Sequence, residues 1–382
     1  MRGIEVFAGC GGLGMGLARA GVKHELVVER DNETIATLLE NKRRGVEYMR
    51  DWTIEGCDTR DIDFTRYQGL DLVAGGPPCQ PFSVGGRHLG RKDPRNMWPE
   101  AIRAVREVCP RAFVFENVRG LLRPSFSTYL EYLTRQLGSP HVVRKPGESW
   151  CTHSARLRRH VEQGGRPEYR VIVRGVNAAD LGAPQKRHRA LIIGVEANAG
   201  ELWDAAIPTH SLEALAWSKH VAFDYWIRHA TRRIRLPSST AEARAVEKIR
   251  LSSIVPQRKP WVTTRDALSG LPPAAAEWDP SGHWQHLGAR AYEKHTGSVW
   301  DEPAKALKAG NHGVPGGENM IALGKGRVRY FTIREMARLQ GLPDEFIVSG
   351  SWKAATRQLG NAVPTAVGAR VGNELKAILA GG

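Results

Sequence analysis

Short apolar runs alternate with amphipathic stretches over residues 1–200. This alternation is typical of an α/β protein with a doubly wound, Rossmann-like sheet. The pattern predicts six strands, over Ile4–Ala8, Glu25–Glu29, Leu70–Gly75, Ala112–Glu116, Tyr169–Val173 and Ala190–Val195. It also predicts helices between them, at Asn32–Lys42 after an Asp31 cap, at Pro99–Val108 and at Ser127–Leu137. In such a sheet, functional residues belong at the carboxyl ends of the strands.

The pattern changes at about residue 200, where the chain becomes irregular and rich in Trp, His and Pro. We therefore expect a second, smaller and irregular domain there. A regular helical pattern over Thr365–Leu379 is expected to pack back onto the first domain. The predicted division is a first domain of residues 1–200, completed by residues 355–382, and a second domain of residues 201–354.

Composition narrows the range of functions. Lys and Arg total 55 against 40 Asp and Glu, a net charge of +15, which favours a polyanionic partner such as nucleic acid. Charge alone fits a merely basic protein equally well. The five cysteines form no CxxC pair, so neither a disulfide framework nor a metal site is expected. No apolar stretch approaches the roughly 20 residues that span a bilayer, so we expect a cytoplasmic protein without a membrane partner.

A glycine-rich segment follows the first predicted strand. The sequence FAGCGGLG, residues 7–14, fits the pattern GxGxxG, and Glu29 ends the next predicted strand. Glycines at this spacing let the backbone approach a nucleotide-like ligand, and a carboxylate can bind ribose hydroxyls. A tight glycine turn in any α/β protein would look the same, and dinucleotide binding is an alternative.

A second segment carries a candidate nucleophile. GGPPCQPFS, residues 75–83, follows a predicted strand and places Cys79 at the rim of the sheet. Prolines on both sides make a stiff loop, which suits a fixed nucleophile better than a small buried apolar residue. Glu116 ends another strand and brings a carboxylate near that thiol. A lone Glu there is more often a cap or an ion-pair partner, but with Cys79 a nucleophile and acid pair is the better interpretation.

These segments resemble motifs of the DNA (cytosine-5)-methyltransferase family, and the resemblance covers nearly the whole chain in the family's order. The glycine loop resembles the family's cofactor loop, the Cys segment its nucleophile loop, and Glu116-Asn-Val its acid motif. Further matching segments are VERD (28–31), Asp61-Ile62, QKRHR (185–189), ARLQGLPDEF (337–346) and QLGNAVPTAVG (358–368).

The resemblance implies a sheet of the S-adenosylmethionine-dependent methyltransferase type and methyl transfer to C5 of a flipped-out cytosine in a short duplex sequence. Cys79 would attack C6, protonated Glu116 would hold N3 and N4, Arg187 would favour the thiolate and Arg189 would meet the base. S-adenosylmethionine is the expected cofactor, with contacts at Phe7, Gly9, Gly11, Gly12, Leu13, Glu29, Asp61, Ile62, Pro78 and Asn361. The expected DNA contacts are Gln80, Ser83, Arg95, Asn117 and Gln185.

The resemblance also bears on partners and alternatives. Double-stranded DNA is the expected partner, residues 200–330 occupy the place of the family's variable target-recognition domain, and 83–98 would clamp DNA. The chain resembles a monomeric bacterial restriction-modification enzyme, for which any cognate endonuclease would be a separate protein. One alternative is an RNA cytosine-5 methyltransferase of the transfer-RNA branch, although that branch's Cys-Phe-Thr element is missing. Another is an inactive DNA-binding relative, against which the intact set of Cys79, Glu116, Arg187 and Arg189 argues.

Two features remain open. Residues 146–168 exceed what a minimal family member needs, and we expect either an additional DNA contact or an added surface helix. His283 and His286 have the spacing of a metal pair, but a structural role is favoured because no third ligand is nearby.

Overall fold

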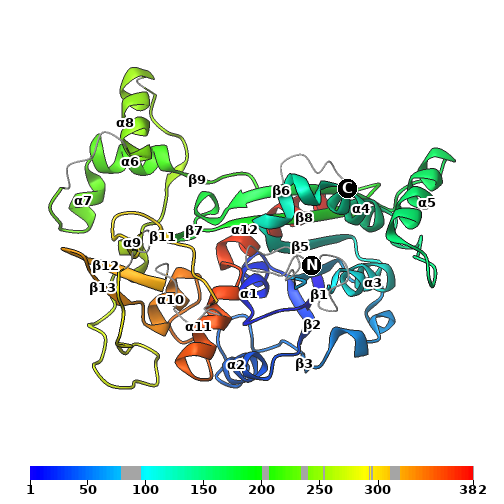
Figure 1. Cartoon of the computed structure of the whole chain (residues 1–382), viewed down its shortest axis with the longest axis horizontal. Coiled ribbons are helices and arrows are strands. Elements are labelled where there is room, and N and C mark those ends of the chain that lie inside the picture. Colours follow the sequence, from blue (N-terminus) through cyan, green and yellow to red (C-terminus); the bar gives the residue numbers. More distant parts are fainter. Residues whose placement is uncertain are drawn as a thin grey trace. The chain divides into compact units, whose positions relative to one another are not determined.

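The computed structural model describes residues 1–78, 96–199, 206–233, 240–252, 254–291, 293, 296–309 and 319–381. The chain forms two compact units (Figure 1). Unit 1 comprises Met1–Val176, His188–Ala206 and Gly368–Gly382, and unit 2 comprises Asn177–Arg187 and Ile207–Val367. The expected division differs from these units in three places, one of which is Ala206, which belongs to unit 1 and not to the second domain. Residues 177–187 join unit 2 because their short strand pairs with a strand of that unit, and residues 355–367 also belong to unit 2.

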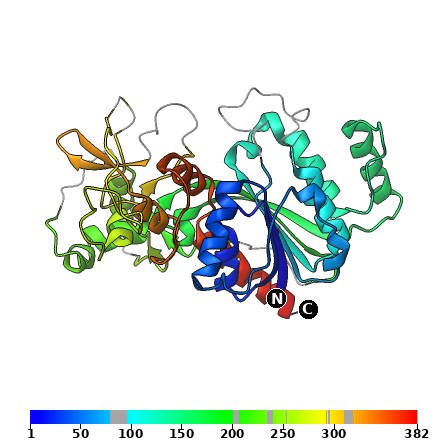
Figure 2. The same cartoon turned by 90° about the horizontal axis from the view of Figure 1, so that it is seen from below.

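Unit 1 is built on a seven-stranded sheet with helices on both faces (Figure 2). Its strands are β1 (Arg2–Val6), β2 (Lys23–Glu29), β3 (Ile54–Gly56), β4 (Leu72–Gly75), β5 (Ala112–Val118), β6 (Tyr169–Asn177) and β8 (His188–Glu196). Its helices are α1 (Gly12–Arg19), α2 (Asn32–Arg43), α3 (Trp98–Val108), α4 (Ser127–Gly138), α5 (Trp150–Glu162) and, from Gly368 on, α12 (Thr365–Ala380).

The strand order is β3-β2-β1-β4-β5-β8-β6. Strands β1 to β5 pair in parallel, whereas β8 runs antiparallel to β5. The chain leaves β1 toward β2 and β3 and then crosses to β4 on the other side of β1. In an open sheet, the crevice at such a switch of direction, beside the carboxyl ends of the strands, is where ligands bind.

Apolar strands hold this sheet together. Residues of β4 and β5 such as Val73 and Phe113 are fully buried, as expected for strands covered on both faces. Trp98 at the start of α3 packs edge-to-face on Phe115, with ring centroids 5.8 Å apart. The Asp31 side chain caps α2 by accepting a hydrogen bond from Thr34 N at 3.0 Å, as the sequence predicted.

All six predicted strands are present, with ends shifted by up to four residues. The sequence did not reveal β3, which has three residues and a largely exposed pattern, as is usual for a short edge strand. It also did not reveal β7 (Gln185–Lys186), which pairs over two residues with β11 (Ala304–Lys305) in unit 2. The predicted helices Asn32–Lys42, Pro99–Val108 and Ser127–Leu137 correspond to α2, α3 and α4.

Unit 2 is more regular than the sequence suggested. Its helices are α6 (Leu212–His220), α7 (Asp224–Arg228), α8 (Ala241–Ser252), α9 (Thr264–Leu268), α10 (Ile333–Leu339) and α11 (Trp352–Asn361). The strands β12 (Met320–Gly324) and β13 (Arg327–Tyr330) form a hairpin, and β9 (His210–Ser211) pairs with β10 (Lys259–Pro260). Ala216 of α6 packs with Val246 and Ile249 of α8, a pairing that short, separated apolar segments do not show in sequence.

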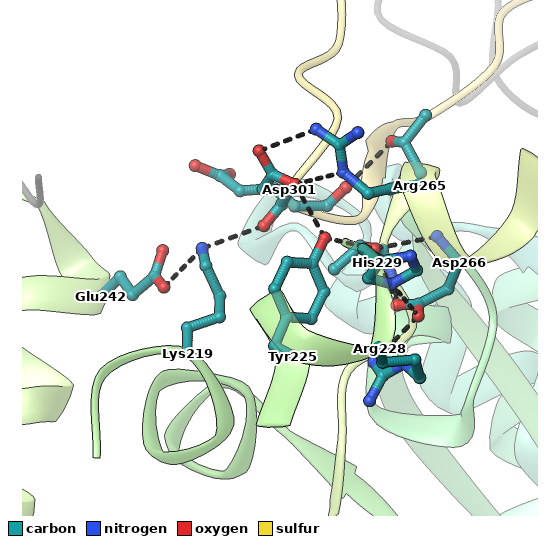
Figure 3. A network of polar contacts seen from close by, with 11 residues as sticks. Lys219, Tyr225, Arg228, His229, Glu242, Arg265, Asp266 and Asp301 are labelled. Carbon is teal, nitrogen blue, oxygen red and sulfur yellow. Dashed lines mark hydrogen bonds and ion pairs between the residues drawn. The ribbon is translucent and has the colours of Figure 1, made fainter. Parts of the chain in front are cut away.

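A network of buried polar groups joins the helices of unit 2 (Figure 3). Lys219 donates to the carbonyl oxygen of Asp301 at 3.0 Å and pairs with Glu242 at 2.6 Å. Burial raises the pKa of Glu242, but the hydrogen bond from His220 and the charge of Lys219 outweigh it, so this pKa is lowered overall. Tyr225 donates to Asp301 at 2.9 Å. The charges are paired and hydrogen-bonded, which is the condition for tolerating them in an interior.

Among the described residues, no helix is long and apolar enough to cross a membrane. The same residues contain no group of three or more His, Cys, Asp or Glu side chains arranged to hold a metal ion. Both ring nitrogens of His283 are engaged, with Thr332 Oγ1 at 2.9 Å and Pro272 O at 2.8 Å, and His286 stacks on Trp352 with ring centroids 4.0 Å apart. His283 is thus held by hydrogen bonds and His286 by ring stacking, and the structural role favoured from the sequence stays a prediction.

Candidate active site

The glycine loop after β1 is fixed by a carboxylate from the neighbouring strand. Gly9 N donates to Glu29 Oε2 at 2.8 Å, and Glu29 Oε1 accepts from the backbone N of Arg30 and of Asp31 at 2.8 and 2.9 Å. Phe7 has φ 57° and Gly9 has φ 55°, so the loop turns through the left-handed region at both positions. The structure thus brings Phe7, Gly9 and Glu29 together at the end of the sheet where ligands bind.

The other predicted cofactor residues of the loop continue into α1. Gly12 and Leu13 are buried in its first turn, and Gly11, with φ 84°, is its N-cap residue. No side chain at the N-cap bonds to the first turn, so the amides of that turn depend on other partners. This loop and helix form the backbone surface that the sequence assigned to the cofactor.

Asp61 and Ile62 lie at the end of the short helix Thr59–Asp61 that follows β3. Asp61 is exposed and Ile62 is half-buried. Arg103 of α3 donates to Ile62 O at 3.0 Å and to Thr59 O at 2.8 Å and so holds this turn in place. Sequence reasoning missed Arg103. Its only signal was its spacing from Glu100 and Glu107, with which it pairs on α3.

The segment that leads to the candidate nucleophile lies against the end of β5. A Cβ placed on Gly76 would be 3.6 Å from Glu116 Oε2 and 3.8 Å from Phe7 O, so Gly76 lies between the acid and the glycine loop. Asn117 Nδ2 donates to Pro77 O at 3.1 Å. Asn117 is 2% exposed, and its contact holds the segment that ends in the half-buried Pro78.

Glu116 forms an ion pair with Arg189. Arg189 Nε is 2.5 Å from Glu116 Oε1, and the two side chains are only 15% and 10% exposed. The pairing follows from the antiparallel register of β5 and β8, in which Arg189 is opposite Val118 and therefore diagonal to Glu116 on the same face. The structure thus brings together two of the four predicted catalytic residues.

Three other predicted site residues lie in unit 2. Arg187 is 1% exposed and donates to Leu307 O at 2.8 Å and to Gly360 O at 2.7 Å. Gln185 is fully buried and donates to Leu339 O at 2.7 Å and to the side chain of Gln340 at 3.0 Å. Asn361 is exposed at the end of α11. Arg187 and Gln185 thus hydrogen-bond to the two segments of unit 2 that resemble family motifs, residues 337–346 and 358–368. The catalytic role of Arg187 and the DNA-binding role of Gln185 stay predictions.

Four predicted residues, Cys79, Gln80, Ser83 and Arg95, lie outside the described residues, as does most of the expected clamp, 83–98. The described residues stop at Pro78, one residue before the candidate nucleophile, and resume at Asn96. Asn96 Nδ2 donates to Tyr129 Oη of α4 at 3.0 Å. The described residues on either side of this gap are therefore anchored within unit 1.

A glycine loop and a carboxylate at the switch point of a doubly wound sheet, with an acid and an arginine at the end of β5, fit the fold of S-adenosylmethionine-dependent methyltransferases. The family model of C-5 cytosine-specific DNA methylases matches residues 1–139 and 153–377. The protein belongs to that family.

Two named relatives are similar in sequence over nearly the whole chain. The Type II methyltransferase M.PspPI of a Psychrobacter species is 29% identical over 97% of this chain and 78% of its own. The Type II methyltransferase M.NgoMIV of Neisseria gonorrhoeae is 28% identical over 97% of this chain and 96% of its own.

Solved structures show the same fold. A putative DNA modification methyltransferase encoded within an E. coli prophage has a TM-score of 0.55 at 20% identity, and the match covers 100% of this chain and 99% of that chain. The Dnmt2 methyltransferase of S. pombe has a TM-score of 0.56 at 16% identity over 100% and 98% of the two chains.

Proposed function

We propose that this protein transfers a methyl group from S-adenosylmethionine to C5 of a cytosine in a short sequence of duplex DNA, through a covalent bond between Cys79 Sγ and C6. One observation carries the proposal. The Glu116–Arg189 pair lies at the end of β5, beside the Gly76–Pro78 segment that leads directly into Cys79. An acid beside the segment that leads into a nucleophile supports addition to a pyrimidine ring.

The glycine loop fits the proposed cofactor. When bound, S-adenosylmethionine supplies a methyl group made electrophilic by its sulfonium centre. A carboxylate offers about four acceptor positions, and the three backbone N–H groups at Glu29 leave capacity for a ribose hydroxyl. Exposed Asp61 and half-buried Ile62 supply a polar and an apolar contact for the remainder of a nucleoside.

The residues divide the chemistry between them. The target base first leaves the helix, because C6 of a stacked cytosine is out of reach. The Cys79 thiolate adds to C6 while a proton is delivered to N3 through the Glu116 carboxyl group, so that negative charge does not accumulate on the ring. The electron pair then at C5 would form the bond to the methyl group as the bond from that methyl to the sulfonium sulfur breaks, which leaves a neutral thioether. Loss of the C5 proton to a base expels the Cys79 sulfur as thiolate, and return of the N3 proton to Glu116 restores the neutral aromatic ring.

Arg189 has a positioning role in this scheme. Its ion pair with Glu116 fixes the carboxyl group at the strand end, and its remaining guanidinium N–H groups can donate to acceptors on the base. The Asn117 contact to Pro77 fixes the approach of the nucleophile segment in the same way. Both contacts belong to the end of β5, so one strand positions the acid and supports the loop.

The relatives named above as Type II methyltransferases support a restriction-modification setting. In that setting the chain acts as a monomer on duplex DNA, and a cognate endonuclease would be a separate protein. The decisive experiment incubates the purified protein with bacterial genomic DNA and labelled S-adenosylmethionine and locates 5-methylcytosine by bisulfite sequencing. Methylation at one short motif is the expected result. Transfer to RNA alone, or binding of DNA without transfer, would refute the proposal in favour of the two alternatives.

A further inference from the structure

Helix α5 and the loop before it form a strongly basic part of unit 1 that the proposed chemistry does not use. Residues 140–166 carry six Lys and Arg but only two Glu. The family match is interrupted over residues 140–152, so this segment includes material outside the shared family pattern. The structure shows a helix here, one of the two outcomes expected from the sequence.

One face of α5 is fixed against α4. His153 is fully buried, with Tyr132 Oη at 2.9 Å from Nδ1 and Val142 O at 2.7 Å from Nε2. Trp150 packs edge-to-face on Tyr132, with ring centroids 5.7 Å apart, and Leu157 is 2% exposed. Ser149 caps the helix through Thr152 N at 3.0 Å. The helix is therefore a rigid support for whatever its outer face presents.

The outer face presents cations without neutralising partners. Arg158 and Arg159 are both exposed, and no acidic side chain in the described part of the chain pairs with either. Arg156, by contrast, pairs with Glu148 at 2.8 Å. Further exposed cations from the same segment are Arg144, Lys145 and Arg166. An excess of unpaired positive charge on a fixed helix is the electrostatic footprint of a polyanion-binding surface.

The position of α5 suggests which polyanion it meets. Helix α4 follows β5, the strand that ends at the Glu116–Arg189 pair, and α5 lies beyond α4 at the outside of unit 1 (Figure 1). The surface is thus part of the same unit as the site but separated from it by a helix. The family's substrate is duplex DNA. A duplex that extends past the target cytosine is therefore the polyanion expected to meet this surface.

We propose that the outer face of α5, centred on Arg158 and Arg159, binds backbone phosphates of duplex DNA outside the recognition sequence. The proposal rests on the proposed DNA substrate. Contacts to phosphates carry no sequence information but add affinity that depends on salt. The surface would therefore favour long DNA over short DNA without changing the methylated motif or the rate of the chemical step.

The test compares two duplexes carrying the methylated motif, one of about 12 base pairs and one of about 40 base pairs. The logarithm of the DNA-binding constant falls linearly with the logarithm of the salt concentration. Removing one phosphate-binding cation should make this slope shallower by about 0.9, which corresponds to a loss of roughly fivefold in DNA affinity at 0.15 M salt. For Arg158→Gln/Arg159→Gln we expect KM on the long duplex to rise about 25-fold. KM on the short duplex and kcat on both should stay at wild-type values.

The control variant Arg43→Gln/Arg44→Gln removes the same charge from the exposed C-terminal end of α2. Helix α2 begins after the carboxyl end of β2 and runs back toward the amino ends of the strands. Its last residues therefore lie away from the strand ends that carry the site, so the KM of this variant for the long duplex should stay near the wild-type value. An unchanged KM and salt slope for the α5 variant on the long duplex, or an equal rise in KM on both duplexes, would overturn the inference. Absence of methylation of either duplex by the wild-type protein would instead refute the proposed function.

Discussion

A buried polar pair beneath the glycine loop predicts how the stability of unit 1 depends on pH. Glu5 of β1 is 1% exposed and His24 of β2 is 3% exposed. Glu5 Oε2 and His24 Nε2 are 3.8 Å apart, too far for a hydrogen bond. Burial raises the pKa of Glu5 to about 8, against a lowering hydrogen bond from Gly14 N, and burial lowers the pKa of His24 to about 4. At pH 7 both groups are therefore neutral, and their contact is not an ion pair.

The magnitude follows from proton linkage. An ordinary Glu pKa of 4.5 against about 8 in the folded protein corresponds to roughly 5 kcal/mol. Because the folded pKa is raised, this stability is fully present below pH 4.5 and is lost as the pH rises toward 8. The pKa of His24 is depressed from 6.5 to about 4, so its contribution of roughly 3 kcal/mol is present above pH 6.5 and is lost as the pH falls.

The perturbation is Glu5→Gln, which keeps the shape of the side chain but cannot titrate. A substitution of Glu5 by a side chain of another size would also change the packing, because the Glu5 carboxylate lies directly against Gly14: a Cβ on Gly14 would be 2.0 Å from Glu5 Oε2. We expect the free energy of unfolding of the Gln variant to exceed that of the wild type by several kcal/mol at pH 8 and to approach it near pH 5. Urea unfolding at intervals between pH 5 and 9 measures the difference.

The matched control is Glu25→Gln on the neighbouring strand β2. Glu25 pairs with Arg2 at the surface, and the hydrogen bond from Arg2 lowers its pKa, so it is ionised throughout this range. The free energy of unfolding of the Glu25→Gln variant should therefore differ from that of the wild type by the same amount at every pH between 5 and 9. If the Glu5→Gln variant loses stability from pH 5 to 8 with the wild-type slope, Glu5 is ionised in the folded protein and the reasoning is wrong.

Four further predictions concern the residues that the sequence assigned to the site. Cys79→Ser should abolish methyl transfer but retain cofactor binding, which calorimetry measures. The wild-type protein should be trapped covalently on DNA that carries 5-fluorocytosine at the target position, which a gel shift detects. Glu116→Gln should lower kcat by about 10²–10⁴-fold, because proton donation to the ring is lost; single-turnover transfer at the wild-type rate would contradict this. Arg187→Met should destabilise the protein by about 2–6 kcal/mol in urea unfolding, because two buried carbonyl oxygens, Leu307 O and Gly360 O, lose their donor at about 1–3 kcal/mol each.

Local pattern was sufficient for the strands and for the residues at their ends. Glu116 and Asn117 were placed at a strand end from the apolar run before them, and the structure ends β5 there. The ion pair between Glu116 and Arg189 was out of reach of such reasoning, because it depends on β8 running antiparallel beside β5. The hydrogen bonds from Arg187 to Leu307 O and Gly360 O join residues more than a hundred positions apart in sequence, so local pattern did not reveal them.

The helices of unit 2 illustrate a different limit. Helix α6 shares its core with α8, and neither has an apolar stripe long enough to be recognised alone. The unit's interior also contains paired polar groups such as Lys219 and Glu242, which sequence patterns assign to the surface. Helix α5 was left open for a similar reason, since its charged residues outnumber the few that pack on α4.

The return of the chain to unit 1 at Gly368 has a consequence for how this protein is made. A Cβ on Gly368 would lie 2.5 Å from Leu13 O, and one on Gly372 would lie 2.7 Å from Ala20 Cβ, so the last helix rests directly on α1. During synthesis, α1 and its loop are complete early, yet their cover arrives only after Ile207–Val367 has been translated. Unit 1 therefore depends on one of the longest-range contacts in the chain, which slows folding and leaves apolar surface open in the nascent protein.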